Sequence, residues 1–472
     1  MPIMPHPSPD AGSHLRLWVE RSVLLLVAVL AMQTWYVEGL LVPCPVASGS
    51  MAETLLGVHR EVTCKDCGFR FVCDADLKPV SARAVCPNCG YADNDLDSRP
   101  DLAGDRVLVV KPIFQFRRPR RWEVVAFRDP GQASRTLVKR VAGLPGESIQ
   151  IRHGDVYADG QIQRKTLPQQ RAVAVLVHDA NYRPSIDPTP QPRWQGTKNS
   201  RWISAGGRFA HPQVSGKEAD DDWLEYRHWQ RVPGRRGEVR ECPVTDLCGY
   251  NQTQPRREED VHPVSDLLLS LRLVKTIGRG RLVLRASTGA DEFRVGIDPN
   301  GRRYEVLRGG QPVAGAAGEL PPLGDGMTLE VSLFDQQFLL AFDGRVVVTM
   351  PYEPSQPGQQ PALPPLAIGS LGGLGVEISD LRVYRDVYYT HPIGLHGRWG
   401  LDGPIHLEAD EYFVLGDNSP ISEDSRTWPA GPAVDAKLLV GKPLVVYFPA
   451  KLVEVGPWRF QVPDPARIRY TR

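Results

Sequence analysis

Two serines lie close together in a run that is suited to nucleophilic chemistry. Ser48 and Ser50 flank Gly49 in the run "SGSM". A nucleophilic serine needs a base that takes its proton and donors that stabilise the oxyanion. The backbone N–H of Ser50 and the hydroxyl of Ser48 are candidate oxyanion donors. A flexible linker would have the same composition, so a base elsewhere in the chain must decide between the two interpretations.

A lysine is the candidate base, because none of the 11 histidines lies in a sequence context that suggests a catalytic triad. The apolar run "LVKRV" predicts a strand with Lys139 and Val141 on one face and Arg140 on the other. Burial disfavours the charged ammonium, so a buried lysine can act as a general base near neutral pH. The alternative is a lysine that extends from a strand edge into solvent.

A polar loop supplies the third group of side chains. It reads "GDNSPISEDSR", residues 416–426, and follows the strand-like run "YFVL". Ser422 is a candidate to orient the base by a hydrogen bond. Asp424 and Arg426 are candidates for an ion pair that braces the loop. An ordinary polar turn is the alternative for this segment taken alone.

Together with an apolar run before Ser50, these motifs resemble the type I signal peptidases, which are membrane-anchored Ser/Lys endopeptidases. The motifs "SGSMAETL", "RVLVVK", "VKRVAGLPGES" and "GDNSPISEDSR" stand in the order of that family, and the resemblance covers about a third of the chain. It implies a serine endopeptidase, a hydrolase that removes signal peptides from secretory preproteins through an acyl-enzyme. It also implies that catalysis needs no cofactor and that the substrate binds as an added extended strand.

The resemblance gives each candidate residue a role. It implies that Ser50 is the nucleophile and that Lys139 is the general base. The supporting residues would be Ser48 as an oxyanion donor, Ser422 as the group that orients the lysine, Asp424 and Arg426 as supports of the loop, and Met51 as part of the substrate-binding surface.

Four cysteines have the spacing of a zinc ribbon. Cys64 and Cys67 form one Cys-x-x-Cys pair, and Cys86 and Cys89 form a second pair, with eighteen residues between the two pairs. Four thiolates fill the tetrahedral coordination of zinc, which predicts a structural metal with no open position for water. Two disulfides are the alternative, because the outer side of a membrane can be oxidising. A further disulfide between Cys242 and Cys248 is left open.

An apolar run near the N-terminus predicts a single membrane anchor over residues 16–41, with a cleaved signal peptide as the alternative. Arg16 and Arg21 precede the most apolar part, so residues 1–15 are expected in the cytoplasm and the catalytic part on the outer side of the cell membrane. The lipid bilayer is therefore an expected partner. The net charge of +1 gives no argument for a nucleic-acid partner.

The rest of the chain predicts a mostly β fold, because short β-branched runs alternate with turn residues and convincing helices are scarce. The expected catalytic core is a signal-peptidase-like β fold made of residues 42–62, 99–164 and 401–472. The expected insertions are a zinc-ribbon-like segment, 63–98, and a longer segment, 165–400, that contains a linker and a β-sandwich over about 223–390. The runs "FLLAFDGRVVV" and "VEISDLRVYRDV" give the sandwich a loose resemblance to concanavalin- and laminin-G-like jelly rolls.

A function of a different class is also consistent with this organisation. On this alternative, the chain is a membrane-tethered protein that binds carbohydrate or another protein through the jelly roll. Its peptidase core would then be degenerate. Trp223, Tyr226 and Trp229 would stack on sugars in that case, or pack in the core of the sandwich. The presence of Ser50 and Lys139 together favours the peptidase.

Overall fold

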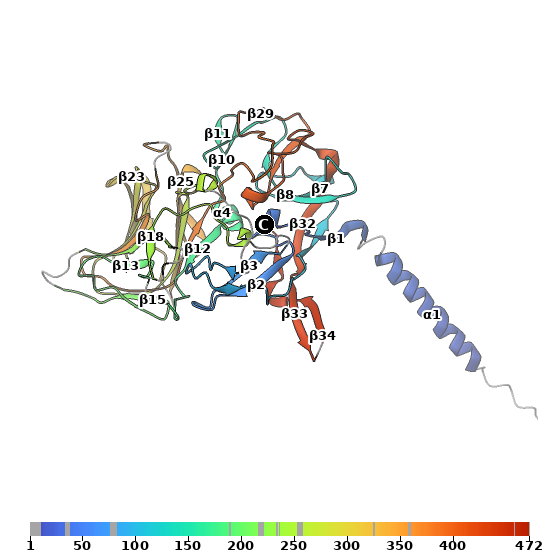
Figure 1. The fold of residues 1–472 in the computed structure, drawn as a ribbon, viewed down its shortest axis with the longest axis horizontal. Coiled ribbons are helices and arrows are strands. Elements are labelled where there is room, and N and C mark those ends of the chain that lie inside the picture. Colours follow the sequence, from blue (N-terminus) through green and yellow to red (C-terminus); the bar gives the residue numbers. More distant parts are fainter. Residues whose placement is uncertain are drawn as a thin grey trace, which may run out of the picture.

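The chain folds into a mostly β protein in the computed structural model (Figure 1), as the sequence predicts. The structure describes residues 11–33, 38–75, 83–187, 190–215, 221–232, 235, 237–252, 258–323, 326–356, 360–456 and 458–471. The short helical elements are α2 (Glu38–Leu40), α3 (Ile113–Phe116), α4 (Leu167–Val173), η2 (Gly49–Met51), η4 (Gly249–Asn251), η5 (Glu258–Asp260), η6 (Phe334–Gln336), η7 (Ser419–Ile421), η8 (Ala436–Leu438) and η9 (Pro465–Arg467).

The longest helix, α1 (Ala11–Met32), projects away from the β-rich body (Figure 1). The side chains of residues 17–32 are exposed. Within the described ranges, no helix has both the length and the apolarity that crossing a membrane requires. The predicted transmembrane anchor over residues 16–41, of which 34–37 lie outside the described ranges, is therefore not supported, since α1 ends at Met32.

One antiparallel sheet, here called the core sheet, brings together three separate parts of the sequence. Its strand order is β1-β6-β32-β7-β8-β30-β31, with β35 paired to β32. The strands are β1 (Leu41–Pro45), β6 (Arg106–Val110), β7 (Val124–Arg128), β8 (Thr136–Gly143), β30 (Glu411–Leu415), β31 (Val434–Asp435), β32 (Leu439–Phe448) and β35 (Arg469–Tyr470). Buried apolar clusters cover both faces of β7, since Val125 and Val124 belong to different clusters.

A smaller sheet joins segments that lie far apart in the sequence. Its order is β11-β10-β9-β29, made of β9 (Ser148–Arg152), β10 (Asp155–Ala158), β11 (Gln161–Ile162) and β29 (Ile405–His406). Ile149 of β9 pairs with Ile405 of β29. The chain thus leaves the core after β11 and returns to the same sheet more than two hundred residues later.

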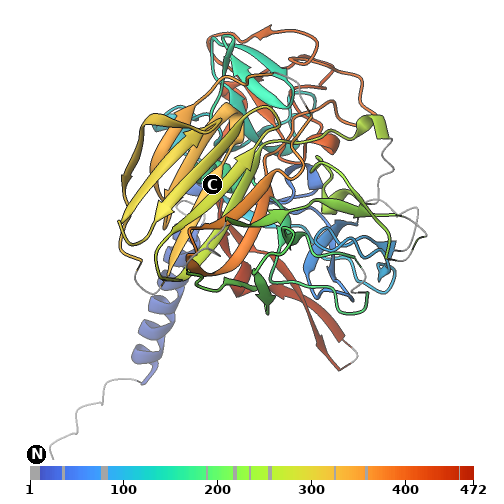
Figure 2. The ribbon, with the colours of Figure 1, turned by 90° about the vertical axis from the view of Figure 1, so that its left-hand side faces the viewer.

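Two larger sheets form a sandwich between these ends, and Figure 2 shows its long strands side by side on the near face of the molecule. The first sheet holds β12 (Val175–Asp179), β14 (Ile203–Ala205), β15 (Arg208–His211), β19 (Leu267–Ile277), β24 (Met327–Ser332), β25 (Gln337–Phe342), β26 (Arg345–Pro351) and β28 (Gly375–Arg385). The second holds β13 (Trp194–Gly196), β16 (Asp222–Tyr226), β20 (Arg281–Ser287), β21 (Glu292–Asp298), β22 (Arg303–Arg308), β23 (Gln311–Glu319) and β27 (Leu366–Leu371). A single apolar cluster contains side chains of both sheets, including Leu271 and Leu284.

Four short hairpins complete the described fold. They are β2 (His59–Thr63) with β3 (Arg70–Asp74), β4 (Arg83–Ala84) with β5 (Asn94–Asp95), β17 (Trp229–Arg231) with β18 (Val239–Glu241), and β33 (Ala450–Val455) with β34 (Trp458–Pro463). The first two lie around the four spaced cysteines, which belong to a small buried cluster of their own.

Candidate active site and cysteine site

The candidate nucleophile lies in a tight turn directly after the first strand of the core sheet. Ser50 occupies η2 and is half-buried, while the next residue, Met51, is 1% exposed and packs into the apolar cluster under the core sheet. The hydroxyl of Ser48 donates to the hydroxyl of Ser50 at 3.3 Å. The structure thus brings the two predicted serines together, and it places Met51 beneath the turn in the core.

Lys139 lies in the middle of β8, between β7 and β30, and its side chain is 3% exposed. Its Nζ donates a hydrogen bond to the hydroxyl of Ser422 at 3.0 Å. Burial lowers the pKa of Lys139 to about 8, against an upward contribution from the Asp424 carboxylate. The lysine is therefore partly uncharged near neutral pH, which a general base requires.

The polar loop meets the serine turn at a glycine. A Cβ atom on Gly416 would lie 2.1 Å from the Ser422 hydroxyl and 2.4 Å from the Ser50 carbonyl oxygen, so a larger residue does not fit there. The backbone N–H of Asn418 donates to the same Ser50 carbonyl at 3.1 Å. The loop that holds Ser422 against Lys139 is thereby fastened to the main chain of Ser50.

Asp424 and Arg426 form a fully buried ion pair at the base of this loop. Two hydrogen bonds join the guanidinium to the carboxylate, at 2.9 and 2.7 Å. Burial raises the pKa of Asp424, but Arg426 outweighs it and keeps the pKa below its ordinary value. The carboxylate also accepts from the N–H of Gly416 at 2.9 Å, so the pair fixes the loop at the glycine that meets Ser50.

A second buried ion pair, which the sequence did not reveal, supports the same region. The guanidinium of Arg140 donates to both carboxylate oxygens of Asp417, at 2.7 and 2.6 Å, and both side chains are nearly inaccessible. Asp417 also accepts from the hydroxyl of Thr54 at 2.6 Å. The sequence signal for this ion pair is an arginine within an apolar strand, because a buried guanidinium requires a carboxylate partner.

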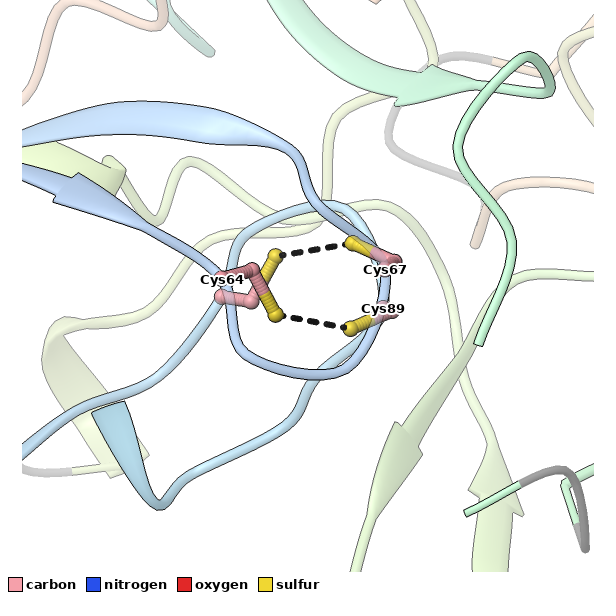
Figure 3. A group of neighbouring side chains, drawn as sticks. Cys64, Cys67 and Cys89 are labelled. Atoms are coloured by element: carbon pink, nitrogen blue, oxygen red, sulfur yellow. Dashed lines mark hydrogen bonds between the residues drawn. The ribbon is translucent and has the colours of Figure 1, made fainter. Parts of the chain in front are cut away.

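The four spaced cysteines converge on one point. The sulfur atoms of Cys64, Cys67, Cys86 and Cys89 all lie within 4.8 Å of one another, and Figure 3, in which Cys64, Cys67 and Cys89 are labelled, shows the sulfurs turned toward a common centre. The distances are 3.6 Å between Cys64 and Cys89 and 3.7 Å between Cys67 and Cys86. Four sulfurs around a tetrahedral zinc at about 2.3 Å are separated by about 3.8 Å, whereas a disulfide measures about 2.05 Å.

The observed spacing therefore fits four ligands of one metal better than two disulfides. Cys242 and Cys248, whose pairing the sequence left open, are both free cysteines.

The aromatic side chains considered as a sugar platform lie mostly inside the protein. Tyr226 is 0% exposed and Trp229 is 4% exposed, so both pack as core residues. Trp223 is half-buried, and the guanidinium groups of Arg285 and Arg294 lie over its ring. Interpreting the three as one stacking surface is therefore wrong, because strand alternation turns Tyr226 inward.

Two segments of the chain are similar to a known protein family. Residues 92–211 and 390–448 match the family described as signal peptidase, peptidase S26. The chain is 34% identical over 90 residues to the probable signal peptidase I-1 of Synechocystis sp., covering 16% of this chain and 44% of that protein. It is 33% identical over 76 residues to signal peptidase I V of Bacillus subtilis, again covering 16% and 44%. The chain thus spans less than half the length of these relatives.

Solved structures resemble the chain only weakly. The carbohydrate-binding module CBM66 of Bacillus subtilis covers 41% of this chain and 92% of its own, with 10% identity and a TM-score of 0.22. The β-glucanase of Bacillus licheniformis covers 41% and 92%, with 9% identity and a TM-score of 0.26. The matched sequence segments, in contrast, confirm the resemblance predicted from the motifs: the chain contains, in two parts, a region related to the type I signal peptidases.

Proposed function

We propose that this protein is a membrane-associated serine endopeptidase that removes signal peptides from exported preproteins with a Ser50/Lys139 dyad. The observation that carries this proposal is the hydrogen bond from the buried Lys139 amine to Ser422, next to the glycine that touches the Ser50 carbonyl. Burial provides a partly neutral amine, and the loop that accepts its hydrogen bond also donates to the Ser50 carbonyl. The family match over the same strands and loop supports the same reaction.

In the proposed reaction, neutral Lys139 takes the proton of the Ser50 hydroxyl as the serine oxygen attacks the scissile carbonyl. The Ser50 N–H and the Ser48 hydroxyl stabilise the oxyanion. The ammonium then gives its proton to the leaving amine, and an acyl-enzyme remains. A water molecule, deprotonated by the same lysine, releases the signal peptide and restores Ser50.

Within this proposal, the apolar and exposed part of α1 from Val23 to Met32 attaches the protein to the bilayer, with residues 1–15 cytoplasmic and the catalytic core on the outer side. Removal of residues 1–33 should abolish co-flotation with phospholipid vesicles while cleavage of a short signal-peptide substrate persists. Flotation that is unchanged by the truncation would contradict this role of α1.

We also propose that the four cysteines hold a structural zinc ion, because their number and spacing fill a tetrahedral site and leave no position for a reacting water. The core segments 42–62, 99–164 and 401–472 would then be separated by this zinc-binding insertion and by the sandwich-containing insertion 165–400. Catalysis itself uses no step at the cysteine site.

Cleavage of a preprotein by the wild type and by Ser50→Ala and Lys139→Ala tests the proposed function. Both variants should lose at least about 10³-fold in kcat, since residues of a catalytic unit act together. Lys437→Ala, which changes a lysine with an 87% exposed side chain, is the matched control and should cleave normally. Unchanged processing by either active-site variant would refute the dyad and favour a binding protein with a degenerate core.

A further inference from the structure

We propose that the long insertion completes the peptidase site, and that Asn251 is a positioning residue for the Ser50 turn. This inference rests on the proposed function. Asn251 ends η4, a short turn that belongs to the insertion and not to the core sheet. It lies 167 residues before its partner Asn418 in the polar loop.

The two asparagines form a reciprocal pair of hydrogen bonds. The amide nitrogen of Asn251 donates to the Asn418 oxygen at 2.6 Å, and the amide nitrogen of Asn418 donates back at 2.7 Å. Both side chains are buried, at 5% and 2% exposure. Each amide in this pair fixes the orientation of the other, because turning either one would oppose two donors or two acceptors.

Asn418 also contacts the main chain of the candidate nucleophile. The second hydrogen of its amide nitrogen is donated to the carbonyl of Gly49 at 2.9 Å, and its backbone N–H is donated to the carbonyl of Ser50 at 3.1 Å. The main chain on both sides of the Ser50 side chain is therefore held by one residue. That residue in turn depends on Asn251 for the direction of its side chain.

Packing from the same turn reinforces the hydrogen bonds. Tyr250 is 0% exposed and clusters with Ala52 and Leu56, which follow the serine. A Cβ atom on Gly49 would lie 2.1 Å from the Tyr250 ring, so the ring occupies the space beside this glycine. The Tyr250 hydroxyl donates to the carbonyl of Val58 at 3.3 Å. The insertion thus contacts the serine turn before and after Ser50.

The cysteine-containing insertion holds η4 from the other side. Gln252 and Val85 exchange two hydrogen bonds, at 2.6 and 2.5 Å, and Val85 directly precedes Cys86. The Cys73 thiol lies 3.8 Å from the Gly249 carbonyl as a weak donor. The segment 249–252 is consequently held between the cysteine site and the serine turn.

Loss of the Asn251 amide should act on the rate and leave substrate binding nearly unchanged. Asn418 would keep an unpaired buried carbonyl, and its amide could rotate away from Gly49. A small displacement of a nucleophile lowers the rate of attack strongly. For Asn251→Ala we expect kcat to fall at least about tenfold, with KM changed less than about twofold. The double variant with Asn418→Ala should be no slower than Asn418→Ala alone, because the two residues act through one contact.

The matched control is Gln337→Ala. Gln337 is also 5% exposed, and its amide donates to the Lys165 carbonyl at 3.1 Å, inside the insertion and away from Ser50. The control should keep the wild-type kcat. Asn251→Asp keeps the size of the side chain and removes the donor, so it serves where the alanine variant does not fold. Wild-type kcat in Asn251→Ala or Asn251→Asp would overturn the inference.

Hydrogen–deuterium exchange separates this inference from the proposed function. Amides of residues 49–58 should exchange faster in the Asn251 variants than in the wild type and in Gln337→Ala. This holds whether or not the wild type cleaves a preprotein. Failure of wild-type cleavage refutes the proposed function, whereas unchanged exchange in residues 49–58 refutes the positioning role of Asn251.

Discussion

The amine of Lys139 donates to the hydroxyl of Ser422 at 3.0 Å although 283 residues separate the two in sequence. Strand β8 supplies the lysine, and β30, its neighbour in the core sheet, leads into the loop that carries the serine. The pairing of these two strands therefore sets the distance between the candidate base and the hydroxyl that orients it. The predictions below test this arrangement and its supports.

Activity should rise with pH through about 8. Lys139 must be uncharged to accept the Ser50 proton, and burial lowers its pKa to about 8. Below that pH the neutral fraction, and with it kcat/KM, should fall about tenfold per pH unit. Initial rates on a short signal-peptide substrate between about pH 6 and pH 9 provide the measurement. A profile that falls as the pH rises through 8 would exclude a neutral lysine as the base.

The substitution Lys139→Met should abolish activity and stabilise the fold at pH 7. The pKa of Lys139 is about 8 in the folded protein and 10.5 ordinarily, so the unfolded chain binds more protons between these values and stability rises with pH there. Below about pH 8 the buried ammonium costs up to about 3 kcal/mol. Denaturant unfolding should show the gain of Lys139→Met at pH 7, and the gain should shrink toward pH 10. An equal difference at both pH values would contradict this account.

Gly416→Ala should separate the serine turn from the polar loop. The added Cβ would lie 2.4 Å from the backbone oxygen of Ser50, a contact that a side-chain rotation cannot relieve. We expect a loss of kcat of at least about 10²-fold, since a misplaced nucleophile reacts slowly. Gly403→Ala is the control, because a Cβ at Gly403 meets nothing within 4 Å. Equal kcat for both alanine variants would show that the contact at Gly416 has no importance.

Asp417→Asn should destabilise the protein by about 3–5 kcal/mol, because it removes the carboxylate charge that faces the buried guanidinium of Arg140 at 2.6 Å. Asp435→Asn is the matched control, since it changes an exposed pair with Lys437 and should alter the free energy of unfolding by less than about 0.5 kcal/mol. Urea unfolding measures both. Similar small effects in the two variants would mean that the Arg140 pair is not the support proposed for the loop.

Metal removal should loosen the cysteine site and the segment that depends on it. Gently purified protein should contain one zinc ion per chain by mass spectrometry under native conditions. Chelation should speed amide exchange in residues 64–89 and, through the Gln252–Val85 contacts, in residues 249–252. Protein that contains no metal and has four reactive thiols would contradict the zinc site. Metal loss with unchanged exchange in 249–252 would contradict the coupling.

The candidate dyad could be proposed from the sequence because the runs that carry Ser50, Lys139 and Ser422 occur together and in the order of a known family. Each run alone would also fit a linker, a strand edge or a polar turn. Burial of Arg140 was missed although an arginine in an apolar strand was a signal for it, because strand alternation predicts one exposed face while β7 and β8 are covered on both sides. Asn251 was also missed. Its polar surroundings resemble a surface turn, and its contact with Asn418 exists only after two distant parts of the chain have packed together.

Assembly of the core has a consequence for synthesis on the ribosome. Strand β30 and residue 422 are translated long after Ser50 and Lys139, with the whole sandwich in between. The hydrogen bond between Lys139 and Ser422 therefore cannot form until hundreds of further residues have been translated. Such late closure of long-range contacts is slow relative to local folding, so the proposed site can be completed only when translation is nearly finished.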